Sequence, residues 1–391
     1  MEFDSIIVRF GGEIGIKSEW TRCVYEKMLM RNIKNALEYY RLIPEAVERK
    51  RGRIYIETLR TQETTHKLTK IFGISSVSPA TQTSSDMNTI AQTALNLADK
   101  IIENHSTFAV RCRRIGTQTY SSMDICKEVG KQILSNLKTR NLHVNLTRPQ
   151  FTVSIEVRES KAYVYTKTSH GEGGFPVGSQ AKIVCLLSGG IDSPVACWLA
   201  MKRGCPITPV YIDNAPFTDE NTTTKALETA KKLFEWSIGF PRKIYIAKNG
   251  ENLRTIIEKT PRKLTCILCK RMMYRIAERI AEKEKAEGIV TGEAIGEQAS
   301  QTIHNLRVIN EAATRYPIHR PLLGFDKTET ENIARKIGTF EISTQRARSC
   351  TAAPSKPATK AKLQKIKEAE GKLDIERMVE ESVKAAKITE V

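Results

Sequence analysis

Residues 182–194 constrain the fold most, because they place a glycine turn between a strand and a helix. The apolar run Lys182-Ile-Val-Cys-Leu-Leu187 is followed by Ser188-Gly-Gly-Ile-Asp-Ser193 and then by Pro194. We expect Ser193 to cap the helix and Pro194 to take its first position, where a missing N–H costs nothing. Gly189 and Gly190 let the backbone approach an anion, and the helix start supplies free N–H groups. The segment therefore predicts a phosphate-binding loop.

The loop belongs to neither of the two commonest phosphate motifs. It is not GxxxxGK[ST] and it is not GxGxxG, so dinucleotide binding loses support. A tight turn that binds nothing is the structural alternative, which the complete SGGIDS string between strand and helix disfavours. Asp192 is the one acid in the loop, and a carboxylate beside phosphates is suited to hold Mg²⁺.

The pattern of elements changes at residues 168–180, which contain four glycines and a proline. After this linker, strands at 182–187, 208–213, 243–247 and 288–291 alternate with helices, which predicts a parallel sheet covered by helices. Residues 362–388 are helical by pattern. Before the linker, a strand at 5–10, a helix at 18–40 capped by Ser18 and a hairpin at 46–57 predict a small α+β unit.

Residues 60–168 show a second α/β pattern. Helices are expected near 64–72, 87–103 and 121–138, and strands near 107–114, 150–157 and 161–167. The length of the chain also favours more than one domain. We expect an N-terminal domain at 1–58, a second domain at 59–168, a linker at 169–180 and a nucleotide-binding domain at 181–391.

The chain carries a large excess of positive charge, with 62 Lys and Arg against 44 Asp and Glu and a net charge of +18. Such a balance favours a polyanionic partner, most simply nucleic acid. Arg111 and Arg113 are expected on one face of a strand, because side chains alternate along strands. A second basic group contains Arg49, Lys50, Arg51 and Arg53. Charged protection of sheet edges is the alternative, and two such groups favour phosphate contacts.

The nine cysteines are odd in number and irregular in spacing, which argues against a secreted disulfide scaffold and for a reducing compartment. The start of the chain does not resemble a signal peptide, and no apolar run reaches the roughly 18 residues of a membrane span. We therefore expect a cytoplasmic protein without a membrane partner. The pair Cys266-Ile-Leu-Cys269 opens an expected helix and is compatible with redox, zinc, iron–sulfur or purely structural use.

The SGGIDS loop resembles the PP-loop of ATP pyrophosphatases, which activate a carbonyl as its adenylate. Further segments are similar to the tRNA 4-thiouridine synthetase family, in the same order along essentially the whole chain. They are Arg9–Lys17, Phe72–Pro79, Gly171–Gly178, Ile289–Gln301, Arg320–Leu322 and Phe325–Glu329. The resemblance implies a ferredoxin-like N-terminal domain, a THUMP RNA-binding domain and a PP-loop ATP pyrophosphatase domain. No segment up to Val391 resembles the rhodanese domain of many members, so we expect the rhodanese-lacking type with CxxC.

Carried over by position, the resemblance implies a set of nucleotide contacts. They are Leu186, Leu187, Ser188, Gly189, Gly190, Asp192, Ser193, Tyr211, Ile212, Lys270, Gly292 and Gln301. The family usually has Arg where Lys270 stands, and Lys lacks the bidentate fork of Arg. Asp192 and Cys350 are the implied catalytic residues.

The resemblance also implies that Cys266, Cys269 and Cys350 bind an iron–sulfur cluster. Three thiolates on four irons would leave one iron open for sulfide. A persulfide on Cys350 is the alternative sulfur carrier. Cys185, Cys197 and Cys205 lie on apolar patterns and are expected in the core.

The implied activity is ATP-dependent sulfur transfer to tRNA, which converts uridine 8 to 4-thiouridine through an adenylated uridine. The implied ligands and partners are ATP, Mg²⁺, tRNA and a sulfur donor, and we also expect a second copy of the chain as partner. Two alternatives remain open: a PP-loop enzyme that modifies another RNA base, and a non-catalytic THUMP RNA-binding protein. ATP–pyrophosphate exchange separates the second alternative from an enzyme.

Overall fold

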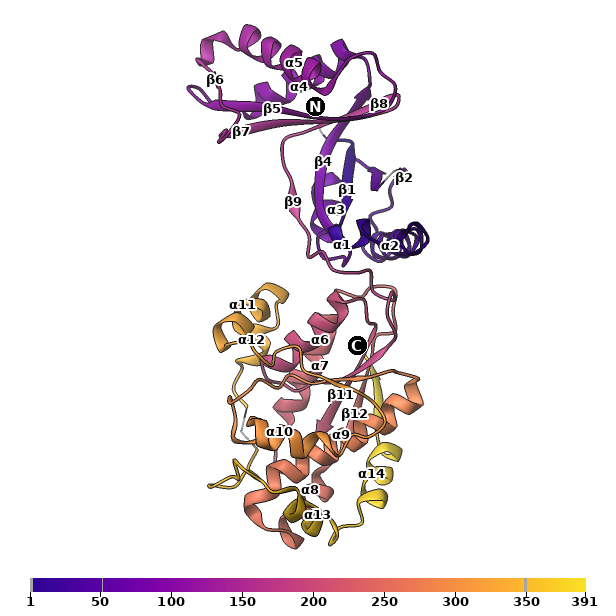
Figure 1. The fold of residues 1–391 in the computed structure, drawn as a ribbon, viewed down its shortest axis with the longest axis vertical. Coiled ribbons are helices and arrows are strands. Elements are labelled where there is room, and N and C mark those ends of the chain that lie inside the picture. Colours follow the sequence, from indigo (N-terminus) through magenta and orange to yellow (C-terminus); the bar gives the residue numbers. More distant parts are fainter. Residues whose placement is uncertain (1–2, 51, 348–349) are drawn as a thin grey trace. The chain divides into compact units, whose positions relative to one another are not determined.

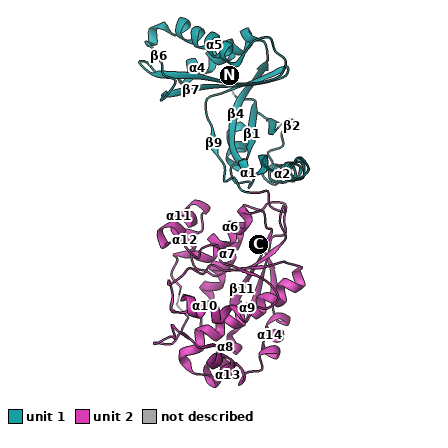
Figure 2. Cartoon of the chain, in the orientation of Figure 1, with its two compact units in different colours: residues 1–174 teal, residues 175–391 magenta. Residues whose placement is uncertain are grey.

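The computed structural model describes residues 3–50, 52–347 and 350–391; Arg51 of the basic group lies outside them. The chain divides into two compact units, residues 1–174 and residues 175–391, which Figure 2 shows in different colours. Each unit is described by itself. Within the described residues, no helix has both the length and the apolar character needed to cross a bilayer.

The start of the first unit is the expected α+β arrangement. Strand β1 (Ser5–Phe10) lies between β3 (Arg53–Glu57) and β4 (Ile74–Ser84), antiparallel to both, and β2 (Ala46–Lys50) completes the hairpin with β3. Helix α2 (Glu19–Tyr39) follows the short α1 (Gly12–Gly15) and is capped by Ser18, as predicted, through the N–H of Thr21. The hairpin and its register hold Arg49 and Arg53 near the start of α2.

Strand β4 was not expected from the sequence, and it joins the two parts of this unit. Its first half pairs with β1, and residues 81–84 pair with β8 (Lys161–Tyr165). Beyond β8 the sheet continues through β7 (Phe151–Arg158), β5 (Thr107–Ile115) and β6 (His143–Val144), and β9 (Ser169–His170) pairs with β4. Figure 1 shows α4 (Met87–Ile101) and α5 (Ser122–Asn136) together on one face of this second part. Helix α3 (Thr61–Leu68) packs on β4.

The second unit contains the predicted parallel sheet. Its strand order is β14 (Ile318–His319), β13 (Ile289–Val290), β10 (Ile183–Leu186), β11 (Ile207–Asp213) and β12 (Lys243–Lys248), all parallel. Its principal connecting helices are α6 (Asp192–Lys202), α7 (Glu220–Phe234), α8 (Gly250–Lys259), α9 (Thr265–Glu284), α10 (Ile303–Asn310), α11 (Lys327–Ile337) and α12 (Phe340–Ser343). The carboxyl ends of β10, β11 and β13 therefore meet at one edge, where α/β proteins bind ligands.

The prediction that residues 362–388 are helical is correct for most of the segment but not for its end. The segment forms α13 (Leu363–Glu370), α14 (Ile375–Lys384) and the edge strand β15 (Lys387–Glu390), which pairs antiparallel with β12. Gly371 follows the first helix, and Asp374 caps the second by accepting the N–H of Arg377 at 3.3 Å. The cap starts a second helix. The apolar pattern of the sequence continues through this break, so the pattern does not indicate that the first helix ends there.

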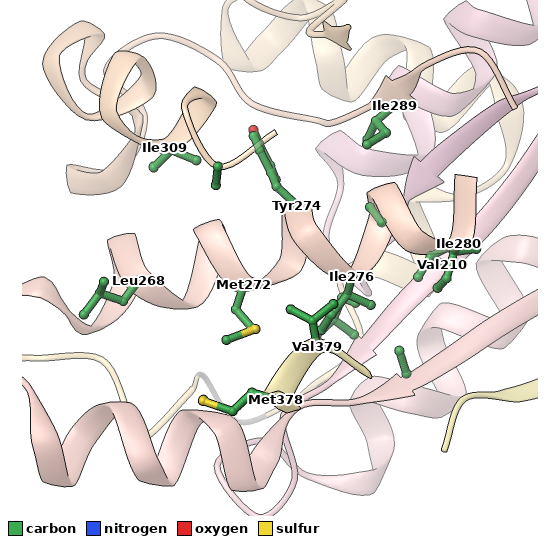
Figure 3. Packing of buried hydrophobic residues seen from close by; sticks show 14 of the residues in the cluster. Val210, Leu268, Met272, Tyr274, Ile276, Ile280, Ile289, Ile309, Met378 and Val379 are labelled. Carbon is green, nitrogen blue, oxygen red and sulfur yellow. The ribbon is translucent and has the colours of Figure 1, made fainter. Parts of the chain in front are cut away.

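Helix α9 lies at the centre of the second unit and carries the CxxC pair in its first two turns. Figure 3 shows Met272 and Ile276 of α9 in the cluster that also contains Val379 of α14. Arg271 and Arg275 of α9 both pair with Glu370 of α13. This packing fixes the start of α9, and with it the two cysteines, relative to the sheet.

Candidate active site

The phosphate loop is braced by its own serines. Ser193 Oγ accepts the N–H of Ser188 at 2.8 Å and lies 2.9 Å from Ser188 Oγ, which accepts the N–H of Gly190 at 3.2 Å. Ser193 is therefore not the N-cap that we expected, and Pro194 is not the first helical residue. Helix α6 begins at Asp192 after Ile191, without a side-chain cap. An uncapped helix start leaves N–H groups available to an anion.

Gly292 closes this site from the loop that follows strand β13. A Cβ atom added to it would lie 2.6 Å from the nitrogen of Ser193 and 2.8 Å from the carbonyl carbon of Asp192. Such distances to backbone atoms exclude any side chain. The contact brings the predicted residue Gly292 directly against the start of α6.

The other predicted contacts on the sheet lie on adjacent strands. Leu186 ends β10, and the N–H of Leu187 donates to Val210 of β11 at 2.9 Å. Tyr211 and Ile212 are buried near the carboxyl end of β11. Gln301 is buried in the short helical turn Ala299–Gln301. Tyr211 Oη and Gln301 Oε1 are among the buried polar atoms of the described residues that have no hydrogen-bond partner. A buried polar atom without a partner is destabilising, and a ligand that supplied one would remove this penalty.

Asp192 shares an ammonium group with a second carboxylate. Lys327, the first residue of α11, lies 2.8 Å from Asp192 Oδ1 and 2.5 Å from Glu297 Oε1. Burial raises the pKa of Asp192, and the nearby carboxylates of Glu297 and Glu331 act in the same direction against the opposing effect of Lys327. Two carboxylates held beside a phosphate loop are suited to a Mg²⁺ ion that also binds phosphate oxygens.

Lys270 is held by a buried carboxylate. Its Nζ lies 2.9 Å from Glu293 Oε1, while Arg320 Nε and Tyr274 Oη lie 2.8 Å and 2.5 Å from Glu293 Oε2. Burial by itself would raise the pKa of Glu293, but the ammonium of Lys270 and the hydrogen bond from Tyr274 hold that pKa at about 2. Glu293 therefore stays ionised and fixes two cations next to Gly292.

The three cysteines of interest come together in the second unit. Cys350 and Cys269 belong to one apolar cluster with Leu253 and Ala352. Burial, with smaller contributions from Cys350 and Cys266, raises the pKa of the Cys269 thiol to about 12. Burial and Cys350 likewise raise the pKa of Cys266. Residues 348–349, just before Cys350, lie outside the described part of the chain.

These thiols are near one another but do not form a ready-made metal site. Within the described residues, no group of three or more His, Cys, Asp or Glu side chains is arranged to hold a metal ion. Cys185 and Cys197 are buried in the core, as expected, whereas Cys205 is half-buried and lines a cavity.

The first unit contains a basic cavity of about 620 Å³ between the hairpin and α2. Its lining includes Arg22, Arg49, Arg53 and Arg113. Burial lowers the pKa of Arg53, and the neighbouring cations Arg9, Arg113 and Arg158 lower it further against the opposing effect of Glu156. A cavity in which cations crowd one another attracts an anion.

Comparison with known proteins identifies the group to which these features belong. Residues 178–375 match the family described as thiamine biosynthesis protein (ThiI). A probable tRNA sulfurtransferase of Methanosarcina mazei is 43% identical over 390 residues, which cover 99% of this chain and 95% of that protein. The chain belongs to the ThiI family of tRNA sulfurtransferases.

Other similarities cover the remaining parts of the ThiI chain. Residues 5–78 match the ThiI ferredoxin-like domain and residues 84–167 match the THUMP domain. A probable tRNA sulfurtransferase of Thermococcus kodakarensis is 41% identical over 350 residues, which cover 88% of this chain and 90% of that protein. A 4-thiouridine synthetase crystallised with RNA and bound ATP is 35% identical with a TM-score of 0.89, and the match covers 99% of each chain. These findings confirm the expected fold class.

Three residues of this ThiI-family site escaped the sequence analysis: Lys327, Glu297 and Glu293. All three stand in segments that were noticed only for their resemblance to the family. One signal was available for Lys327. Asp326 and Glu329 form a capping box that marks the start of α11 and places Lys327 at its first position.

Proposed function

We propose that this chain is an ATP-dependent tRNA sulfurtransferase that converts uridine, at tRNA position 8, to 4-thiouridine. The observation that carries the proposal is the uncapped SGGIDS loop packed against Gly292, with Asp192 and Lys327 beside it. The family relationship supports it, since a relative of similar fold was crystallised with RNA and ATP.

The first chemical step is adenylation of the base. Uridine O4 attacks the α-phosphorus of ATP, and pyrophosphate leaves. The N–H groups at the start of α6 and the ammonium of Lys327 offset the negative charge that develops on the leaving pyrophosphate. Asp192 and Glu297 would hold Mg²⁺, which when bound supplies further positive charge to the phosphate oxygens.

In the second step, sulfur replaces AMP at C4 of the adenylated uridine. A uracil oxygen leaves C4 poorly and AMP leaves it well, so a sulfur nucleophile adds at C4, AMP departs and a C=S group remains. We propose that Cys350 stands at the sulfur-transfer end of the site, with Cys266 and Cys269 beside it. Those three thiols would hold an iron–sulfur cluster, which when bound would supply the sulfur nucleophile. A Cys350 persulfide is the alternative carrier.

The first unit is the proposed tRNA-binding part. The basic cavity near Arg53 and Arg113 offers phosphate contacts, and the THUMP match supports RNA binding there. The division at residue 58 and the linker at 169–180 remain predictions, as does a homodimer, which sedimentation would test.

Anaerobically reconstituted protein with tRNA, ATP, Mg²⁺ and sulfide tests the function directly. We expect pyrophosphate release and 4-thiouridine at position 8. Pyrophosphate release without thiolated uridine would favour modification of another base, and binding of tRNA without pyrophosphate release would favour a non-catalytic protein. Iron content that is unchanged in Cys266→Ala would contradict the cluster.

Lys327→Met tests the charge beside the loop. We expect pyrophosphate release to fall by roughly 10²–10³-fold, as for other preorganised groups that stabilise a charged transition state. Lys365→Met is the matched control, because Lys365 is exposed on α13. Equal rates in the two variants would remove Lys327 from the mechanism.

A further inference from the structure

Lys225 is a buried lysine that lies between the phosphate loop and the Cys350 segment, which runs from the end of α12 to Thr351. It comes from α7 and is only 7% exposed. Its Nζ donates to the main-chain oxygens of Ser343 at 2.7 Å and Gln345 at 3.0 Å. Ser343 is the last residue of α12 and Gln345 lies two residues beyond it, a few residues before Cys350. Helix ends leave such carbonyls without a partner of their own.

The other side of Lys225 contacts the phosphate loop. A Cβ atom added to Gly189 would lie 3.2 Å from Cβ and 3.5 Å from Cε of Lys225, so the aliphatic stem packs against this glycine. In addition, Ser343 Oγ donates to the main-chain oxygen of Gly190 at 3.2 Å. The end of α12 is thus joined to both loop glycines, once through Lys225 and once through Ser343.

The Cys350 segment is held at its far end as well. The N–H of Thr351 donates to the oxygen of Phe217 at 2.9 Å. Burial lowers the pKa of Lys225, against the opposing effect of Asp219, because burial disfavours the charged ammonium. Removal of Lys225 would leave two carbonyls unpaired at one end of the segment while the other end stayed attached.

We propose that Lys225 is a positioning residue that holds the Cys350 segment in register with the phosphate loop, so that sulfur transfer follows adenylation. The inference rests on the proposed function and deepens it. Lys225 acts through Gly189 and the end of α12, and reacting groups displaced by about 1 Å can lose about two orders of magnitude in rate. The two half-reactions should therefore respond differently to its loss.

The test measures 4-thiouridine formed per pyrophosphate released, in the reconstituted full chain with tRNA, Mg-ATP and sulfide. For Lys225→Met we expect this ratio to fall by about fivefold or more, with a smaller loss in the rate of pyrophosphate release. Ser343→Ala removes one hydrogen bond only, so the ratio should fall less and in the same direction. Lys231→Met, an exposed lysine on the same helix, should keep the wild-type ratio.

A purely structural role would lower both products together. An unchanged ratio in Lys225→Met and Ser343→Ala would overturn the inference. If Lys225→Met does not fold, the ratio in Ser343→Ala decides. If wild-type protein releases no pyrophosphate with tRNA, the proposed function fails first and the inference fails with it.

Discussion

The buried carboxylate of Glu293 makes stability depend on pH at the scale of a single residue. Its pKa is about 2 in the folded chain against an ordinary value of 4.5. Its stabilising effect is therefore complete above pH 4.5 and is lost as the pH falls toward 2. The difference corresponds to roughly 3 kcal/mol of unfolding free energy. We expect Glu293→Gln to cost about this much at pH 7 and much less near pH 3, measured by urea unfolding of the second unit.

Trp198 and Trp236 of the second unit form an edge-to-face pair and provide the fluorescence signal for this measurement. Glu341→Gln is the control, because Glu341 is exposed on α12. A loss of stability in Glu293→Gln that stayed constant from pH 7 to pH 3 would contradict the assigned ionisation. Sequence alone could not identify Glu293 as a site residue, because its partners Lys270 and Arg320 come from two other parts of the chain.

At the scale of elements, the contact between the loop after β13 and the start of α6 sets the form of the nucleotide site. Gly292→Ala would push a Cβ atom into the backbone of Ser193. Overpacking of this kind costs about 1–3 kcal/mol, and here it would also displace the loop. We expect weaker ATP binding by calorimetry together with a lower unfolding midpoint. Gly324→Ala is the matched control, since a Cβ atom there meets nothing within 4 Å; the same loss in both variants would contradict the close contact.

Periodicity predicted most elements of both units but not how they end or join. The alternating pattern after residue 180 gave the parallel sheet, and the SGGIDS string located its loop. The long strand β4 was missed because its serines and threonines resemble a loop, although pairing on both sides stabilises it. Ser193 was assigned as a cap because its type and position fit one. Its hydroxyl is instead used inside the loop, a choice that depends on three-dimensional neighbours.

For the whole molecule, the net charge of +18 should govern tRNA binding more than ATP binding. Each phosphate neutralised by an Arg or Lys releases counterions, so affinity falls as salt rises. We expect the logarithm of the tRNA association constant to fall steeply with the logarithm of salt concentration. Arg113→Gln should make that slope shallower by about one, because Arg113 lines the basic cavity and is exposed on β5.

Filter binding over a salt series measures the slope, and ATP binding over the same series gives an internal reference. Lys384→Gln removes an exposed charge from α14 in the second unit and should leave the slope unchanged. If Arg113→Gln and Lys384→Gln shift the slope equally, the excess charge acts as a diffuse field over the whole chain. If only Arg113→Gln shifts the slope, tRNA phosphates contact the cavity of the first unit, and the electrostatic contribution to tRNA binding is localised there.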